Sequence, residues 1–266
     1  MSPRLSIAVV EDRSPVGASC AVAVAVIQLH HSANDLANHF TLKVDKVRQS
    51  TSCASPPVIS KRNSDTFSTL HSATVEETAE LLIRSPAKHC PLDPVPTWLL
   101  KRAAEQFAPI LTRLCNASFQ AGNLPLSQKH ALVSATLKKS TLDPADLNSY
   151  RSMSQLPFAS KLVERAVASR FVHHCDEHGL LPARQSAYRR YHSTETAVVI
   201  VYNDIVRSID RGEVVPLILL DLSSAFDSVD HDCLTSILRD RFYVAGVALS
   251  WFHSYLSGRT QTFIKF

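Results

Sequence analysis

An apolar run, Val214–Leu220, that ends in the carboxylate of Asp221 is the feature that most constrains the fold of this chain. The run reads VVPLILL and is followed by DLSS. A short apolar run that ends in turn-forming residues is typical of a buried strand. We therefore predict a strand through Leu217–Asp221, with the Asp221 carboxylate held at an open edge of a sheet. A carboxylate on such a rigid support suits the binding of a metal ion.

The rest of the chain mixes helical and extended patterns, which predicts an α+β fold that is helix-rich in its N-terminal part. Thr74 and Glu77 have the spacing of a reciprocal capping box. Pro109 should kink or split the helix that contains it, and Gly122 suits the C-terminal end of that helix. The pattern predicts helices over residues 74–83, 98–120, 160–178, 193–210, 232–240 and 247–256, and strands over 130–137 and from 261 onward.

Cysteine usage and hydropathy bound the class of protein. The six cysteines are scattered without a C-x-x-C pair, which fits reduced intracellular thiols better than a disulfide framework or a zinc site. The pattern leaves open whether the compartment is the nucleus or the cytoplasm. The apolar segment Ala18–Leu29 is too short to span a bilayer, so we expect no membrane partner. Glycine-rich phosphate loops of the Rossmann and P-loop types are absent from the sequence.

Positive charge is concentrated between Lys138 and His192. This stretch holds nine Lys or Arg residues against five Asp or Glu, which accounts for the whole formal net charge of +4. Such an excess could hold phosphate groups, although an ordinary solvated surface can have the same composition. For the acids that follow Asp221, the simpler interpretation is that Asp230 or Asp232 caps the next helix.

Several separate segments occur in an order that resembles the reverse transcriptases of non-LTR, LINE-type retrotransposons. The resemblance covers about residues 30–266 and implies a right-hand polymerase fold, of which these residues would be the fingers and the start of the palm. It divides the chain into a poorly ordered leader and linker (1–70), a helical extension (71–129), a fingers-like region (130–213) and the first part of the palm (214–266). The segments that carry it are CPLDPVPTWLLK, LKK with LDPADLNSYR, SKLVERAVASR, GLLPARQSAYRRYHSTETA, DLSSAFDSVDH and WFHSYLSGRTQ.

The resemblance implies a nucleotide site after the apolar run. Asp221 is similar to the catalytic, metal-binding Asp of the family, and the main-chain carbonyl of Leu222 would be a second contact for Mg²⁺. Phe226 is similar to the aromatic residue under the sugar of the incoming nucleotide, where it would exclude a 2′-hydroxyl. Lys139 and Arg151 resemble the basic residues that hold the triphosphate, a role that suits a bidentate Arg.

The resemblance also implies nucleic-acid contacts before that site, and it shows what the chain lacks. The template-facing residues would be Gln185, Arg189, Arg190 and Ser193. The partners of the complete enzyme would be an RNA template, a DNA primer and deoxynucleoside triphosphates. The aromatic-Ala-Asp-Asp turn that supplies the other metal carboxylates does not occur in residues 1–266, so we expect these residues to be inactive alone. The alternative is a non-enzymatic helical module that binds nucleic acid or protein through the basic stretch.

Overall fold

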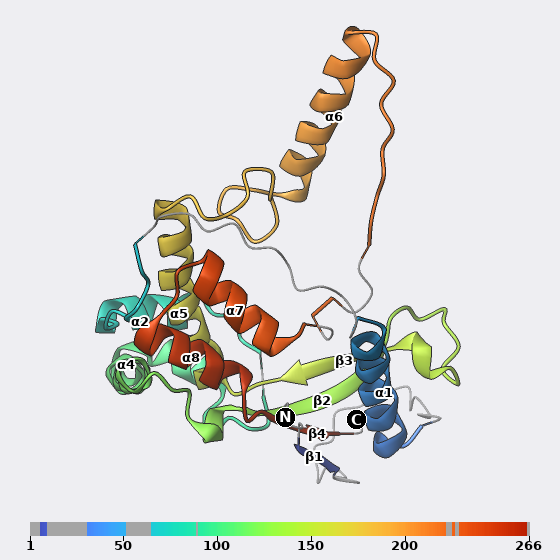
Figure 1. Cartoon of the computed structure of the whole chain (residues 1–266). Coiled ribbons are helices and arrows are strands. Elements are labelled where there is room, and N and C mark those ends of the chain that lie inside the picture. Colours follow the sequence, from blue (N-terminus) through green and yellow to red (C-terminus); the bar gives the residue numbers. More distant parts are fainter. Residues whose placement is uncertain are drawn as a thin grey trace.

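A helical body, a small mixed sheet and one projecting helix make up the part of the chain that the structure describes (Figure 1). The structure is a computed structural model, and it describes residues 6–9, 31–51, 65–88, 90–221, 225–226 and 229–264. Within these ranges no helix is both long enough and apolar enough to cross a membrane. The α+β class predicted from the sequence is compatible with this arrangement.

The sheet has four strands in the order β1-β4-β2-β3. β1 (Ser6–Val9) pairs in parallel with β4 (Thr260–Phe263), which pairs in parallel with β2 (His130–Leu137). β2 pairs antiparallel with β3 (Tyr150–Gln155). The bounds of β2 are those predicted, whereas β3 was missed because its sequence, YRSMSQ, lacks an apolar alternation.

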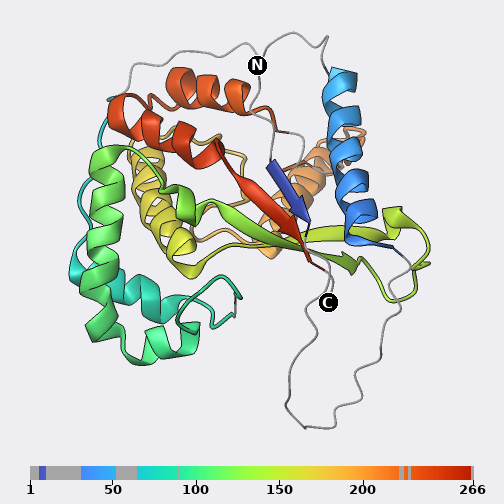
Figure 2. The ribbon, with the colours of Figure 1, turned by 90° about the horizontal axis from the view of Figure 1, so that it is seen from below.

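One face of the sheet is covered by α1 (Ala33–Thr51), as Figure 2 shows. Leu36 and Ala37 of this helix lie in one apolar cluster with Val133 and Phe263 of the sheet. The sequence prediction placed α1 and β1 inside a poorly ordered leader and linker. For these two segments the structure differs, because both gain partners in the sheet that lie more than 80 residues away along the chain.

The helical body has an apolar core of its own, to which no residue of the four described strands contributes. Phe119, Leu162 and Trp251 are almost completely buried there. The Trp251 indole nitrogen donates a hydrogen bond of 2.9 Å to the Ser118 hydroxyl, which satisfies its polar atom inside the core. The helices of the body are α2 (Val75–Arg84), α3 (Thr97–Arg102), α4 (Ala104–Ala121), α5 (Phe158–Glu177), α7 (His231–Arg241) and α8 (Gly246–Leu256), with short 3₁₀ turns at Leu126–Gln128 and Leu147–Ser149.

Helix ends confirm most of the predicted boundaries and correct one of them. Thr74 caps α2 by accepting a hydrogen bond from the Glu77 amide at 3.1 Å, and Gly122 ends α4 with a φ of 57°. The predicted helix over residues 98–120 is divided at Ala103, not at Pro109. Pro109 lies inside α4, which continues past it although the proline nitrogen has no hydrogen to donate.

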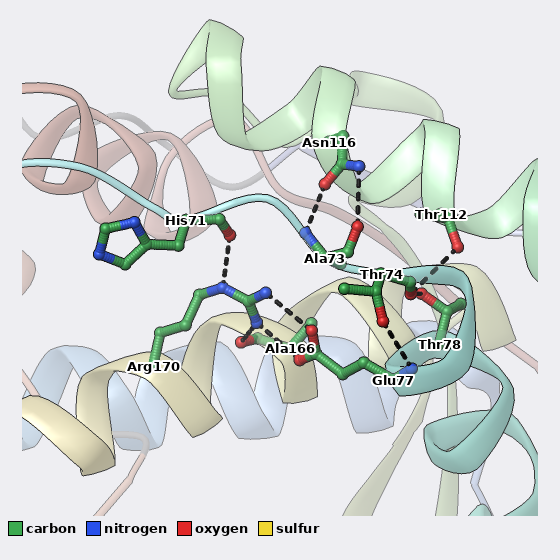
Figure 3. A network of polar contacts seen from close by, with 9 residues as sticks. All are labelled: His71, Ala73, Thr74, Glu77, Thr78, Thr112, Asn116, Ala166 and Arg170. Atoms are coloured by element: carbon green, nitrogen blue, oxygen red, sulfur yellow. Dashed lines mark hydrogen bonds and ion pairs between the residues drawn. The ribbon is translucent and has the colours of Figure 1, made fainter.

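A polar network joins the N-terminal helices to α5 (Figure 3). The Arg170 guanidinium donates to both carboxylate oxygens of Glu77, at 2.8 and 2.9 Å, and to the carbonyls of His71 and Ala166. The predicted return bond from Glu77 to Thr74 is therefore wrong. A bidentate Arg–carboxylate pair is stronger than a bond to a neutral amide, so it takes the Glu77 side chain.

Candidate nucleotide and nucleic-acid site

The apolar run before Asp221 is extended and exposed, so the prediction of a buried strand is wrong for this structure. Val214, Ile218, Leu219 and Leu220 are between 77% and 96% exposed. No strand in the described ranges pairs with the run, and the sheet lies elsewhere. The apolar character was read correctly, but a strand also needs a neighbour for its main-chain groups. Asp221 is consequently exposed as well.

α6 (Thr194–Asp210) precedes this run and projects away from the body in Figure 1. The sequence allowed Ser193 or Thr194 as its N-cap. The structure has Ser193, which forms a capping box with Thr196 through bonds of 3.2 and 2.9 Å. Val198 and Ile209 belong to a stripe of apolar residues at helical spacing, which predicts a helix with one buried face, and the helix is confirmed. The predicted burial is wrong, because α6 has no buried residue and both side chains are about 60% exposed. We call α6 and residues 213–220 together the apolar arm.

Of the two residues that the resemblance assigns to the metal site, the structure describes only Asp221. One carboxylate does not by itself fit a pair of metal ions. Leu222 and Asp227 lie outside the described residues. Asp230 caps α7 by accepting a bond of 2.8 Å from the Cys233 amide, which confirms the simpler of the two interpretations of that acid. Within the described ranges no three His, Cys, Asp or Glu side chains gather where they could hold a metal. A two-metal site needs bridging carboxylates, so no metal-dependent step can be built from these residues alone.

The two basic residues expected at the triphosphate are both exposed. Lys139 lies in the connection that follows β2, and Arg151 lies on β3 opposite Thr136 of β2. Because side chains alternate along a strand, Arg151 projects from the face opposite to that of its neighbour Tyr150, which packs under α1. Both charges are therefore available to a ligand, and Arg151 is carried by a paired strand.

Three of the four residues expected to face a template have partners within the protein. The Gln185 amide donates to the Ala187 carbonyl at 3.1 Å, and the Arg189 guanidinium donates to the Pro182 carbonyl at 3.3 Å. Ser193 is used as the cap of α6. These side chains shape the loop between α5 and α6, which spans residues 178–193. We call it the tyrosine loop because of the two tyrosines that it exposes.

The fourth residue, Arg190, lies over a tyrosine. Its guanidinium carbon is 4.7 Å from the centroid of the Tyr191 ring. Phe226 is 80% exposed, and its ring meets that of Tyr188 edge to face, with centroids 6.5 Å apart. Thirty-eight residues separate Tyr188 from Phe226 in the sequence. The structure thus brings the tyrosine loop against the turn after Asp221, a contact that no local pattern in the sequence could have predicted.

The segment that carries these residues matches a known protein family. Residues 137–265 match the family described as reverse transcriptase (RNA-dependent DNA polymerase). The matched range contains Lys139, Arg151, Asp221, Phe226 and the whole tyrosine loop. α1 to α4 precede the matched range.

Three curated proteins of Drosophila melanogaster are similar to the chain. The RNA-directed DNA polymerase from mobile element jockey is 30% identical over 166 residues, which are 61% of this chain and 18% of that protein. The probable RNA-directed DNA polymerase from transposon BS is 31% identical over 169 residues, 63% of this chain and 18% of that protein. The corresponding protein of transposon X-element is 30% identical over 186 residues, 69% of this chain and 20% of that protein. The chain therefore spans no more than a fifth of the length of these relatives.

Proposed function

The chain belongs to the reverse transcriptases of LINE-type retrotransposons through residues 137–265, and we propose that it contributes the nucleotide- and template-binding part of an RNA-directed DNA polymerase. The observation that carries the proposal is the contact between Phe226 and Tyr188. It joins the residue expected under the nucleotide sugar to the loop expected to face the template. A polymerase needs these two ligands side by side, because the templating base selects the incoming nucleotide.

Each proposed role follows from the chemistry of the side chain. Arg151 would hold the triphosphate, because a guanidinium presents a fixed fork of donors to phosphate oxygens. Lys139 would add a second positive charge near those phosphates. Phe226 would lie under the deoxyribose and exclude a 2′-hydroxyl by contact. Asp221 would give one oxygen ligand to the Mg²⁺ that the complete enzyme would use. Within the right-hand fold, residues 130–213 would belong to the fingers and residues 214–266 to the start of the palm.

We also propose that residues 1–266 do not extend a primer by themselves. The sequence has no aromatic-Ala-Asp-Asp turn, and no three possible metal ligands gather within the described residues, whereas a two-metal site requires several carboxylates. The proposal therefore assigns to these residues the binding and selection of ligands, and not the chemical step.

The test combines primer extension with nucleotide binding. The 266-residue chain is incubated with an RNA template, a DNA primer, deoxynucleotides and Mg²⁺, beside Asp221→Ala. We expect no extension from either protein, and extension that Asp221→Ala abolishes would contradict the proposed inactivity. Binding of dATP and ATP is then compared in wild type, Arg151→Ala and Phe226→Ala. Loss of affinity for both nucleotides in the first variant and loss of the preference for dATP in the second would support the roles. Unchanged binding in both would refute them.

A second candidate function is a non-enzymatic module that binds nucleic acid through the same basic stretch. The exposed rings and Arg190 of the tyrosine loop favour it, because they are presented whether or not the metal site is complete. A salt titration of nucleic-acid binding separates the two. Binding that needs Arg151 and Arg189, is unaffected by Asp221→Ala and occurs without any preference for deoxynucleotides would favour the module.

A further inference from the structure

Two tyrosines of the tyrosine loop, Tyr188 and Tyr191, have no role in the site described above other than the contact of Tyr188 with Phe226. They are 83% and 85% exposed, so neither ring contributes to a core. Their φ angles are 58° and 63°, in the left-handed region that residues with a Cβ rarely adopt. Unfavourable backbone conformations of this kind occur at binding sites, where the surrounding structure holds a side chain in place. Here the conformation presents two aromatic rings to solvent.

The loop is braced by its own polar groups. The main-chain N–H of Gln185 donates to the Pro182 carbonyl at 3.0 Å. The Gln185 side-chain amide donates to the carbonyl of Ala187, the residue before Tyr188. His192 Nδ1 lies 2.9 Å from the Arg190 carbonyl on the other side of Tyr191. An ion pair between Arg184 and Asp204 fastens the loop to α6. These contacts give Gln185 and Arg184 positioning roles, and they fix the main chain on either side of each ring.

The charge around the rings selects the kind of partner. Residues 178–194 contain three arginines and no Asp or Glu. Arg184 is paired with Asp204 and Arg189 with a carbonyl, whereas the Arg190 guanidinium lies against the Tyr191 ring. A cation beside an exposed aromatic ring matches a nucleotide unit, in which a flat base is linked to a phosphate. A duplex offers its phosphates but not the faces of its bases, so the rings favour unpaired bases.

We propose that Tyr188 and Tyr191 form a stacking platform for the unpaired bases of a single-stranded nucleic acid, with Arg190 binding an adjacent phosphate. The inference rests on the proposed function and deepens it, because it names the groups that hold the strand. It also changes the roles of Gln185, Arg189 and Ser193 from contact with the strand to support of the loop. Stacking uses the face that every base has, so the platform accepts RNA and DNA strands of any sequence.

The test is fluorescence anisotropy of labelled strands of about 12 nucleotides with the whole 266-residue chain, at several salt concentrations. The probes are oligouridylate, oligothymidylate and a DNA duplex of the same length. The variants are Tyr188→Ala and Tyr191→Ala, each beside its phenylalanine counterpart, which keeps the ring. Tyr202→Ala is the matched control, because Tyr202 is a 67% exposed tyrosine on α6 outside the loop. Circular dichroism of each variant reports whether the fold is retained.

We expect each alanine variant to bind both single strands about 5- to 150-fold more weakly at an unchanged slope of affinity against salt, because a ring and no charge is removed. The phenylalanine variants and Tyr202→Ala should bind like wild type. Three outcomes would each overturn the platform. The alanine variants could bind within about twofold of wild type, the phenylalanine variants could bind as weakly as the alanine variants, or the duplex could be bound as tightly as the single strands. A strong preference for one sugar would do the same, since it places recognition on the sugar. Binding of dATP and ATP is measured separately, so the platform can hold where the proposed nucleotide-binding roles fail.

Discussion

Replacing Arg170 by alanine tests the network that joins the N-terminal helices to the segment that matches reverse transcriptases. The guanidinium side chain is 11% exposed and donates four hydrogen bonds, two to Glu77 and one each to the carbonyls of His71 and Ala166. It also lies 5.0 Å from the centroid of the Phe119 ring. The substitution removes all of these contacts together and leaves the Glu77 carboxylate without its partner (Figure 3).

The magnitude follows from burial. Removing one partner of a buried ion pair costs about 3–5 kcal/mol, because the remaining charge loses its compensation. Glu77 is 33% exposed, so water solvates part of the freed carboxylate and the lower end of that range applies. We therefore expect Arg170→Ala to lower the free energy of unfolding by about 3 kcal/mol. Arg170→Lys keeps the charge but loses the planar fork, and about half of that loss is expected.

The assay is urea unfolding followed by far-UV circular dichroism, with the slope against denaturant checked for constancy. Arg84→Ala is the matched control, since Arg84 pairs with Glu80 at 3.0 Å while the two side chains are 75% and 66% exposed. An exposed pair one helical turn apart contributes less than about 0.5 kcal/mol. If Arg170→Ala costs no more than Arg84→Ala, the reasoning that assigns stability to the network is refuted.

Three further outcomes are expected. Leu219→Lys should reduce aggregation in light scattering without lowering the thermal midpoint, because Leu219 is 84% exposed, whereas the control Ser140→Lys adds the same charge and should change neither. Amide hydrogen exchange should be fast in α6 and slow in α5, and Ser193→Ala should accelerate it in α6 only; equal protection of the two helices would contradict the exposed position of α6. Burial raises the pKa of the Cys115 thiol to about 11 and that of Cys175 to about 12, from an ordinary 9.0. The unfolded state therefore releases these protons at lower pH than the folded state, and the free energy of unfolding should fall as pH rises above about 9. Cys115→Ser should reduce this loss.

Local signals in the sequence were sufficient for much of the helical body. Thr74, Ser193 and Asp230 cap the helices that follow them, and Gly122 ends α4 in the left-handed conformation. These residues act within one turn of their own position, so their neighbours in the sequence carry the information. The same holds for β2, whose bounds are those that its own residues predict.

Other features depend on partners that are distant in the sequence. Glu77 binds Arg170 instead of closing its capping box, and α1 packs on Val133 of β2 and Phe263 of β4, which are distant in the sequence. β3 has little apolar pattern of its own and is a strand because β2 supplies its hydrogen bonds. In each of these cases a non-local partner decides between conformations that the local sequence permits about equally.

In the candidate site too, some residues could be predicted from the sequence and others depend on contacts that only the structure shows. The resemblance of residues 221–231 to a family motif led to Asp221 and Phe226, but it could not show that Gln185 and Arg189 would brace the tyrosine loop instead of extending from it. An apolar run indicates that its side chains are buried when a packing partner is present, but it does not identify that partner. The run before Asp221 is exposed because no described segment packs against it, whereas the exposure of Tyr188 and Tyr191 is maintained by bonds within their own loop. If that distinction is right, added charge on the apolar arm should leave strand binding unchanged, so Leu219→Lys and wild type should bind oligouridylate with equal affinity. Weaker binding by Leu219→Lys, despite its added positive charge, would mean that the arm and not the tyrosine loop holds the strand.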